Sequence, residues 1–211
     1  MTSLTFFVNP GDESFAPVVS HPGEDAGADI KAYLKDTYDR DELTAFYKKY
    51  KKVLSTHHEL FIDGTKYELS TLDEFLLTLE DSEGLVFLLP GETKLINSGF
   101  KVIMGKTDEL GHPWSSLLPV YKIVSRSGLA CKHNVVVTNA PGIVDCGYQD
   151  WVKVSLTNRG NGFHIFTHGA RIAQGLFELV VNQADRVVTS DESVFEQTQR
   201  STDGFGSTMI L

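Results

Sequence analysis

The sequence has few cysteines and no long apolar segment. Its two cysteines, Cys131 and Cys146, have no CxxC spacing and no second pair beside them, which argues against a disulfide framework and a cysteine-based zinc site. We expect both to be buried as small apolar side chains. No run of about 18 apolar residues is present, so no membrane span is predicted. The first residues, MTSLTFFVNPGDE, lack a basic flank followed by an apolar segment, so we expect no signal peptide and a cytoplasmic location.

Positive charge is also scarce. The chain has 19 Lys and Arg residues against 28 Asp and Glu residues, which gives a net charge of −9. Broad binding to DNA or RNA depends on clustered lysine and arginine, so we expect no nucleic-acid partner. An acidic protein that binds a polyphosphate must concentrate its positive charge locally or recruit a divalent metal ion. The 211 residues, 41% of them hydrophobic, are enough for one good core, and we predict a single domain over 1–211.

Strand patterns dominate from residue 85 onward. Short apolar runs rich in Val, Ile and Phe alternate with corners that contain Pro, Gly and Asn, which is typical of an all-β barrel or jelly roll. A further strand is predicted at 5–8, near the N-terminus. The apolar runs are GLVFLLPGETKLINSGFKVIMG, YKIVSRSGLA, HNVVVTNAPGIVD, WVKVSLTNRG and HIFTHGARIAQGLFELVV.

Residues 33–84 follow a different pattern, which we interpret as an α-helical insertion in the β protein. Apolar residues recur at helical spacing in DRDELTAFYKKYKKVL and again in STLDEFLLTLEDS, so two helices are predicted. Between them, Asp63-Gly64 is typical of a tight β-hairpin. One helix face carries Lys48, Lys49, Lys51 and Lys52. A solvated surface is the favoured interpretation of this face, and binding of a nucleic acid or of a partner protein is the alternative.

The segment RSTDGFGST, at 200–208, combines one arginine and one aromatic residue with two glycines. Gly204 and Gly206 allow backbone angles that turn amide N–H groups toward one point, as in loops that cradle phosphate. Arg200 can bind a terminal phosphate through two hydrogen bonds, and Phe205 offers a flat face to a base. By itself the segment is compatible with a disordered tail as well as with a nucleotide-binding arm.

Together with four earlier segments, this arm resembles the five ordered motifs of the homotrimeric dUTPase family. The order agrees throughout, and the spacing agrees from the second motif to the fourth. The resemblance covers most of 20–32 and 85–208, and it points to a virus- or phage-like member with a helical insertion. The segments are GEDAGADIKA at 23–32, SRSGLACKH at 125–133, TNAPGIVDCGYQD at 138–150, GARIAQ at 169–174 and RSTDGFGST.

The resemblance implies a fold and an assembly. The fold would be the dUTPase-like β-barrel or jelly roll, also called a β-clip. The assembly would be a homotrimer in which the subunits share their active sites. Residues 189–211 would form a flexible C-terminal arm that closes the site, with Arg200 on the γ-phosphate, Phe205 over uracil, and Gly206 and Ser207 also contacting the substrate.

The third motif should hold the reacting groups. By resemblance, Asp145 orients and deprotonates the water that attacks the α-phosphorus, which is the work of a general base. Tyr148 lies against the deoxyribose and leaves no room for a 2′-hydroxyl. Asn139, with the main chain near Gly142 and Ile143, reads the uracil edge. The motif is predicted to form a β-hairpin with too little space beside the base for a thymine methyl group.

The triphosphate should be bound by the other motifs. Arg126, Ser127 and Gly128 supply a guanidinium, a hydroxyl and an amide within three residues, which suits a phosphate chain. The resemblance implies that Gln174 donates its amide to a phosphate oxygen. It also implies that Asp29 holds Mg²⁺ through the metal's water ligands while the triphosphate binds the metal directly.

Other residues of these motifs are given structural roles. Asp25 is interpreted as a turn residue. Arg171 is expected to tie strands or subunits together, and Lys132 and His133 are interpreted as structural.

The implied reaction is Mg²⁺-dependent hydrolysis of dUTP to dUMP and pyrophosphate, which limits uracil incorporation into DNA and supplies dUMP for dTMP synthesis. The expected location is the cytoplasm, or the host cytoplasm if a phage encodes the chain. One alternative is a dCTP deaminase of the same fold. That family places a glutamate base where this sequence has Ser155, and serine cannot shuttle the proton. A second alternative adds a regulatory role, in which a partner protein binds the insertion at 33–84.

Overall fold

A computed structural model describes residues 4–9, 11–35, 44, 45, 48, 59–68, 84–104 and 117–181. These residues are mostly β-strands, with one short 3-10 helix, η1 (Glu13–Phe15), and the α-helix α3 (Ser127–His133). The strands are β1 (Leu4–Val8), β2 (Ala28–Lys31), β3 (Leu60–Ile62), β4 (Thr65–Tyr67), β5 (Leu85–Leu88), β6 (Thr93–Asn97), β7 (Phe100–Met104), β8 (Leu117–Ser125), β9 (Val135–Val137), β10 (Gly142–Asp145), β11 (Lys153–Asn158), β12 (Phe163–Thr167) and β13 (Arg171–Val181).

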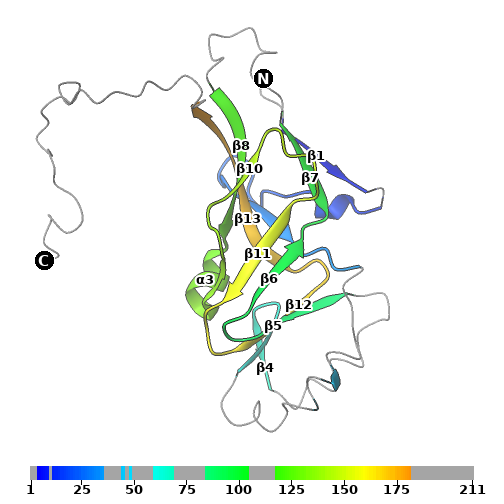
Figure 1. Ribbon diagram of the computed structural model, residues 1–211, viewed down its shortest axis with the longest axis vertical. Helices are drawn as coiled ribbons and strands as arrows, with labels where there is room; N and C mark the ends of the chain where they lie inside the picture. The colour runs from blue at the N-terminus through cyan, green and yellow to red at the C-terminus, as the bar shows by residue number, and fades with distance from the viewer. Residues whose placement is uncertain are drawn as a thin grey trace, which may run out of the picture. The chain divides into compact units, whose positions relative to one another are not determined.

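The strands form four small sheets, which confirms the predicted all-β fold. Their orders are β10-β8-β13-β2, β6-β11-β9, β4-β3-β12-β5 and β1-β7. The pairing of β8 with β13 is the longest, from Ala173 opposite Ser125 to Val181 opposite Leu117. In Figure 1, β1 and β7 lie at one end of these strands, and β4 and β5 lie at the other. Within the described ranges, no helix is long and apolar enough to cross a bilayer.

The core is a continuous cluster that draws side chains from several sheets. Phe100, Tyr121 and Phe166 are its largest buried rings, each at most 1% exposed. Each such side chain contributes roughly 1.5–3 kcal/mol when it is removed from water. Gly175 passes directly over one of these rings, because a Cβ there would lie 1.8 Å from the Tyr121 Oη atom. The close packing of β13 against this ring therefore requires glycine at position 175.

The two ends of the predicted insertion lie next to each other. A Cβ on Gly84 would lie 1.5 Å from the carbonyl oxygen of Leu34, so the chain leaves and returns at neighbouring points. The predicted hairpin is confirmed: β3 and β4 are antiparallel, with φ of 50° at Asp63 and 83° at Gly64. Residues 44, 45 and 48 are helical, and the rest of the two predicted helices lies outside the described residues.

The third motif lies between two strands that pair with each other, as predicted for a hairpin. The flanking strands β9 and β11 are antiparallel, with Val137 opposite Leu156, whereas β10, inside the motif, pairs with β8 in another sheet. The turn between β9 and β10 therefore carries the chain from one sheet to the next. The physical reason is burial, because Val135, Val137 and Val144 all enter the core and each strand completes a different sheet.

The expectation that both cysteines are buried is wrong. Cys131 is exposed and Cys146 is only partly buried. Cys131 lies on the solvent side of α3, since Leu129 is the residue of this short helix that enters the core.

Candidate active site

A pocket of about 380 Å³ lies beside β10 and β11. Four residues that were predicted to bind the nucleoside, Asn139, Gly142, Ile143 and Tyr148, line it together. A Cβ on Gly142 would lie 3.4 Å from Nδ2 and 3.5 Å from Oδ1 of Asn139, so the bare backbone leaves space for this amide at the pocket wall. The remaining lining residues are Leu95, Ile123, Val137, Val144, Val152, Lys153, Val154 and Ser155.

Tyr148 is held in place by its neighbours. Its hydroxyl donates a hydrogen bond to the carbonyl of Trp151 at 3.1 Å, and its backbone N–H donates to the carbonyl of Asp145 at 3.0 Å. These bonds fix a partly exposed aromatic ring at the pocket wall, close in the chain to the predicted general base.

Asp145 ends β10 with its side chain exposed. Burial alternates along this strand, so Asp145 shares a face with the pocket residue Ile143, while Val144 enters the core. Within the described part of the chain, the Asp145 carboxylate has no hydrogen-bond partner. It is therefore free to accept a hydrogen bond from water.

A second cluster forms around Asp29. One carboxylate oxygen accepts a hydrogen bond from Arg126 Nε at 3.0 Å, and the other accepts one from Arg171 Nη1, also at 3.0 Å. Arg126 also donates from Nη1 to the Arg171 carbonyl at 3.1 Å. Gln174 lies opposite Asp29 in the β2–β13 register. The structure thus brings together residues of the first, second and fourth motifs, and Arg171 ties two strands as predicted.

Helix α3 starts directly after Arg126. Ser127 and Gly128 occupy its exposed first turn, where backbone N–H groups have no acceptor within the helix. Asn134 ends the helix in the left-handed conformation, with φ of 55°. A hydroxyl and two amides are therefore available beside the Arg126 guanidinium.

The predicted base and the predicted phosphate-binding residues lie far apart along β8. Asp145 pairs with Val120, whereas Arg126 directly follows Ser125, the last residue of the strand, and is six residues beyond Val120. At 3.4 Å per residue, this separation is about 20 Å. One chain therefore does not bring these groups together. The predicted arm residues Arg200, Phe205, Gly206 and Ser207 lie outside the described part of the structure.

Asp29 fits an indirect role at a metal ion. Both of its oxygens already accept hydrogen bonds from arginine, but a carboxylate has about four acceptor positions, so bonds from metal-bound water can still be accepted. Among the described residues, no three His, Cys, Asp or Glu side chains converge as direct metal ligands. These contacts fit a metal whose inner ligands come from a phosphate chain.

Asp25 has the turn role predicted for it. Its Oδ2 accepts hydrogen bonds from the backbone N–H of His21 at 3.0 Å and from the His21 ring at 2.9 Å. The His21 contact lowers the pKa of this carboxyl group.

Comparisons with known proteins identify the family. The dUTPase family model matches residues 119–209. The deoxyuridine 5′-triphosphate nucleotidohydrolase of Rickettsia akari is 32% identical over 129 residues, which cover 61% of this chain and 77% of that protein. The chain belongs to the dUTPase family. The Pseudomonas entomophila enzyme of the same name is 40% identical to this dUTPase family member over 119 residues, covering 56% of this chain and 70% of that one.

Solved structures show the same fold. The dUTPase of Staphylococcus bacteriophage 80alpha, determined with dUPNHPP, superposes with a TM-score of 0.59 and 16% identity, covering 99% of each chain. Native EIAV dUTPase gives a TM-score of 0.50 at 14% identity, covering 92% of this chain and all of that one. The jelly-roll fold expected for this dUTPase family member is therefore confirmed.

Of the residues that line the pocket of this dUTPase family chain, Leu95 and Lys153 were given no role from the sequence, and Ser155 was considered only as the position of the deaminase glutamate. Leu95 lies opposite Ser155 in the β6–β11 register, and Lys153 shares their pocket. Ser155 donates from Oγ to Thr138 Oγ1 at 3.0 Å. The alternation in WVKVSLT, which buries Val152 and Val154, was a signal for Lys153 and Ser155, but Leu95 required knowledge of the strand pairing.

Two histidines away from the pocket are packed among aromatic rings. His164, which is 1% exposed, stacks on Phe61 with ring centres 4.9 Å apart, and His133 lies 5.5 Å away. Burial, together with the nearby His133, lowers the pKa of His164 to about 4. Burial and then the Lys132 charge also lower the pKa of His133. Both rings are therefore uncharged in the folded protein at neutral pH.

Replacing His164 by Phe is expected to flatten the dependence of stability on pH. The folded-state pKa lies below the unfolded value of about 6.5, so between about pH 6.5 and pH 4 only the unfolded chain takes up this proton. Stability should thus fall by about 3 kcal/mol as the pH drops through this window. Urea unfolding at several pH values would measure the difference between wild type and His164→Phe, and parallel curves would contradict it. Carboxylates such as Asp12 also make stability depend on pH, but both proteins contain them, so their contributions cancel in the difference between the two curves.

Proposed function

We propose that this dUTPase family member hydrolyses dUTP to dUMP and pyrophosphate by attack of water on the α-phosphate, with Mg²⁺ on the triphosphate. The observation that carries the proposal is the convergence of Asn139, Gly142, Ile143 and Tyr148 on one pocket. The Asn139 amide offers both a donor and an acceptor to the polar edge of uracil. Tyr148 packs against the deoxyribose and leaves no room for a 2′-hydroxyl.

Asp145 acts as the general base. Its exposed carboxylate ends the strand whose Ile143 lines the pocket, and no described side chain competes for its lone pairs. A carboxylate in this position accepts the proton of the attacking water.

The triphosphate is bound by Arg126, Ser127, Gly128 and Gln174. Arg126 and Gln174 both lie beside Asp29, which accepts hydrogen bonds from the water shell of Mg²⁺. When bound, the metal neutralises charge on the phosphate oxygens. Arg171 holds the second oxygen of Asp29 and thus keeps the carboxylate in place.

We infer that the active sites are shared within a homotrimer. The distance of about 20 Å between Asp145 and Arg126 along β8 supports this arrangement, since a reacting α-phosphate needs both groups close by. One chain would supply the base pocket and a second the phosphate cluster. A third would supply the arm at 189–211, with Arg200, Phe205, Gly206 and Ser207 over the nucleotide.

In this proposal the protein works on free nucleotides. It limits uracil incorporation into DNA, supplies dUMP for dTMP synthesis, acts in the cytoplasm and needs neither a nucleic-acid nor a membrane partner. The deaminase alternative is disfavoured because Ser155 stands where its glutamate is required. Binding of a partner protein by the insertion at 33–84 stays a separate hypothesis.

Pyrophosphate release from dUTP, dCTP, dTTP and UTP, compared side by side with Mg²⁺, tests the proposal. We expect dUTP to be preferred over dCTP by at least about 10³-fold in kcat/KM, because unpaired buried polar groups penalise the wrong base. UTP and dTTP should be rejected because the 2′-hydroxyl and the thymine methyl group find no room. Chelating Mg²⁺ should remove most of the turnover. Ammonia release from dCTP would contradict the hydrolase assignment, and equal rates with UTP would contradict the role of Tyr148.

A further inference from the structure

One aromatic ring of the insertion is wedged between segments of the dUTPase fold. Phe61 lies in β3 and is 8% exposed. Its ring centre is 4.5 Å from that of His133 in α3 and 4.9 Å from that of His164 in β12, the latter nearly parallel at 11°. A Cβ on Gly162, in the turn before β12, would lie 2.6 Å from Phe61 Cε2. Three segments of the fold thus meet on this ring.

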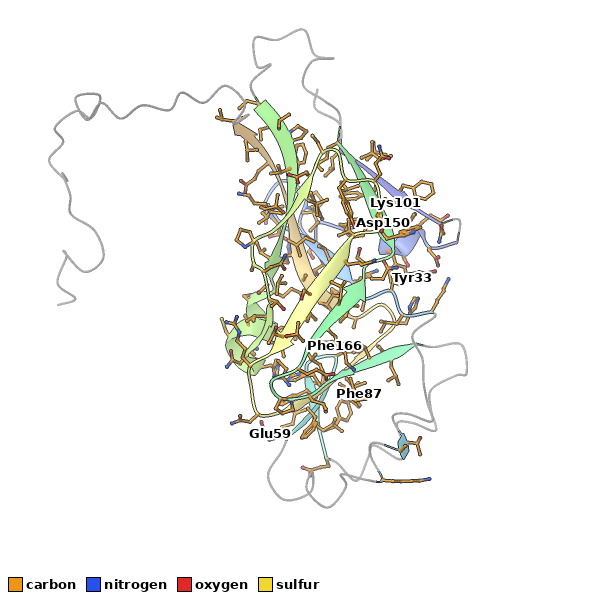
Figure 2. The ribbon with its side chains drawn as sticks, in the orientation of Figure 1. Tyr33, Glu59, Phe87, Lys101, Asp150 and Phe166 are labelled. Atoms are coloured by element: carbon orange, nitrogen blue, oxygen red, sulfur yellow. The ribbon has the colours of Figure 1, made fainter. Side chains whose placement is uncertain are left out.

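The hairpin that carries Phe61 is itself firmly attached. Strand β3 pairs in parallel with β12, and Phe61 lies opposite His164. At the tip, the Asp63 carboxylate accepts hydrogen bonds from the backbone N–H of Thr167 at 2.9 Å and from its hydroxyl at 2.6 Å. Figure 2 shows this region around Phe166, which neighbours the cluster, with Glu59 just before β3. The hairpin therefore forms part of a sheet of the main fold.

The same hairpin contacts helix α3 a second time. A Cβ on Gly64 would lie 3.8 Å from Leu129 Cδ2 and 3.9 Å from His133 Nε2. Leu129 is buried, and His133 is the last residue of the helix. The hairpin thus packs along α3, from its middle to its C-terminal end.

The opposite end of α3 carries the proposed phosphate-binding residues. The helix has seven residues, which corresponds to about 10 Å, so a shift at His133 moves Ser127 and Gly128 as well. Arg126 precedes the helix and bonds to Asp29 at 3.0 Å. The pyrimidine pocket, in contrast, is lined from β6, β8, β9, β10, β11 and the loops next to them, and Phe61 is not among its lining residues.

We propose that the β3–β4 hairpin is a positioning element for phosphate binding, in which Phe61 holds α3 so that Arg126, Ser127 and Gly128 face the triphosphate. This inference rests on the function proposed above. Removing the ring frees the C-terminal end of the helix and weakens the contacts of its N-terminal end. Ligands that bind only through the base and the sugar should not sense the change.

The experiment compares two ligands on Phe61→Ala by isothermal titration calorimetry, a non-hydrolysable imido analogue of dUTP and deoxyuridine. We expect the Kd of the triphosphate analogue to rise on the order of tenfold to a hundredfold, because small misplacements of binding groups have effects of this size. The Kd of deoxyuridine should change by less than about twofold. A purely structural role would weaken both ligands alike, so an equal effect on both, or on neither, overturns the inference.

Two further variants keep the test independent of folding. Gly162→Ala keeps Phe61 but displaces its ring, since the new Cβ would lie 2.6 Å from Phe61 Cε2. Like Phe61→Ala, it should weaken binding of the triphosphate analogue more than binding of deoxyuridine. Ile62→Ala is the matched control: Ile62 is buried in the same strand, and its side chain lies on the other face. It should leave the ratio of the two affinities unchanged, and a changed ratio would overturn the inference.

The wild-type protein in the same titrations separates this inference from the proposed function. If wild type binds neither ligand and does not hydrolyse dUTP, the proposed function is wrong and the inference with it. If wild type binds both and Phe61→Ala shows no selective loss of the triphosphate analogue, the inference alone is wrong.

Discussion

Replacing Asp145 by Asn is expected to remove nearly all dUTP hydrolysis and to leave dUTP binding almost unchanged. Asparagine keeps the size of the side chain but cannot accept a proton from the attacking water. General-base catalysis contributes typically 10²–10⁴-fold, so we expect kcat to fall by about 10³-fold with little change in KM. Stability should change little, since Asp145 is exposed and forms no side-chain hydrogen bond within the described structure.

Steady-state pyrophosphate release and calorimetric binding of the imido analogue measure the two effects separately. Asp150→Asn provides a control at a nearby exposed carboxylate. The Asp150 side chain accepts a hydrogen bond from the Trp151 backbone N–H at 2.7 Å, which an asparagine oxygen can also accept. This variant should keep its activity. Full turnover by Asp145→Asn would overturn the assignment of the base.

Mixing two inactive variants, Asp145→Asn and Arg126→Gln, is expected to restore activity. In the proposed trimer, each site combines Asp145 of one subunit with Arg126 of another, because the two positions lie about 20 Å apart along β8 of a single chain. A site in a mixed trimer is intact when one subunit retains Asp145 and its neighbour retains Arg126. With equal amounts and random assembly, about a quarter of all sites meet this condition.

The measurement requires that subunits exchange. The two variants would be refolded together from denaturant at equal concentration, and activity compared with each variant refolded alone. About a quarter of wild-type turnover is the expected result, and each variant alone should stay close to zero. A mixture that stays inactive, although its size shows assembled trimers of both variants, would contradict shared active sites.

Much of the fold could be predicted because its signals are local. Val- and Ile-rich runs between glycine and proline corners predicted the strands, and the Asp63-Gly64 pair predicted its hairpin. The third motif shows the limit of such signals. Its apolar pattern predicted strands on both sides of the turn, but which strand pairs with which depends on residues far away in the sequence. Here β9 and β10 join different sheets.

The amino-acid sequence by itself determined the order of the motifs, and with it the chemical groups available: an amide and an aromatic ring for the nucleoside, a carboxylate for water, and an arginine with a hydroxyl for phosphate. Only the tertiary structure decided where these groups meet. Strand register brought Leu95 to the pocket and Gln174 to Asp29, and it placed Asp145 and Arg126 far apart along one strand. It also wedged Phe61 against the end of α3. Such positions follow from long-range pairing and packing, which no short stretch of sequence encodes.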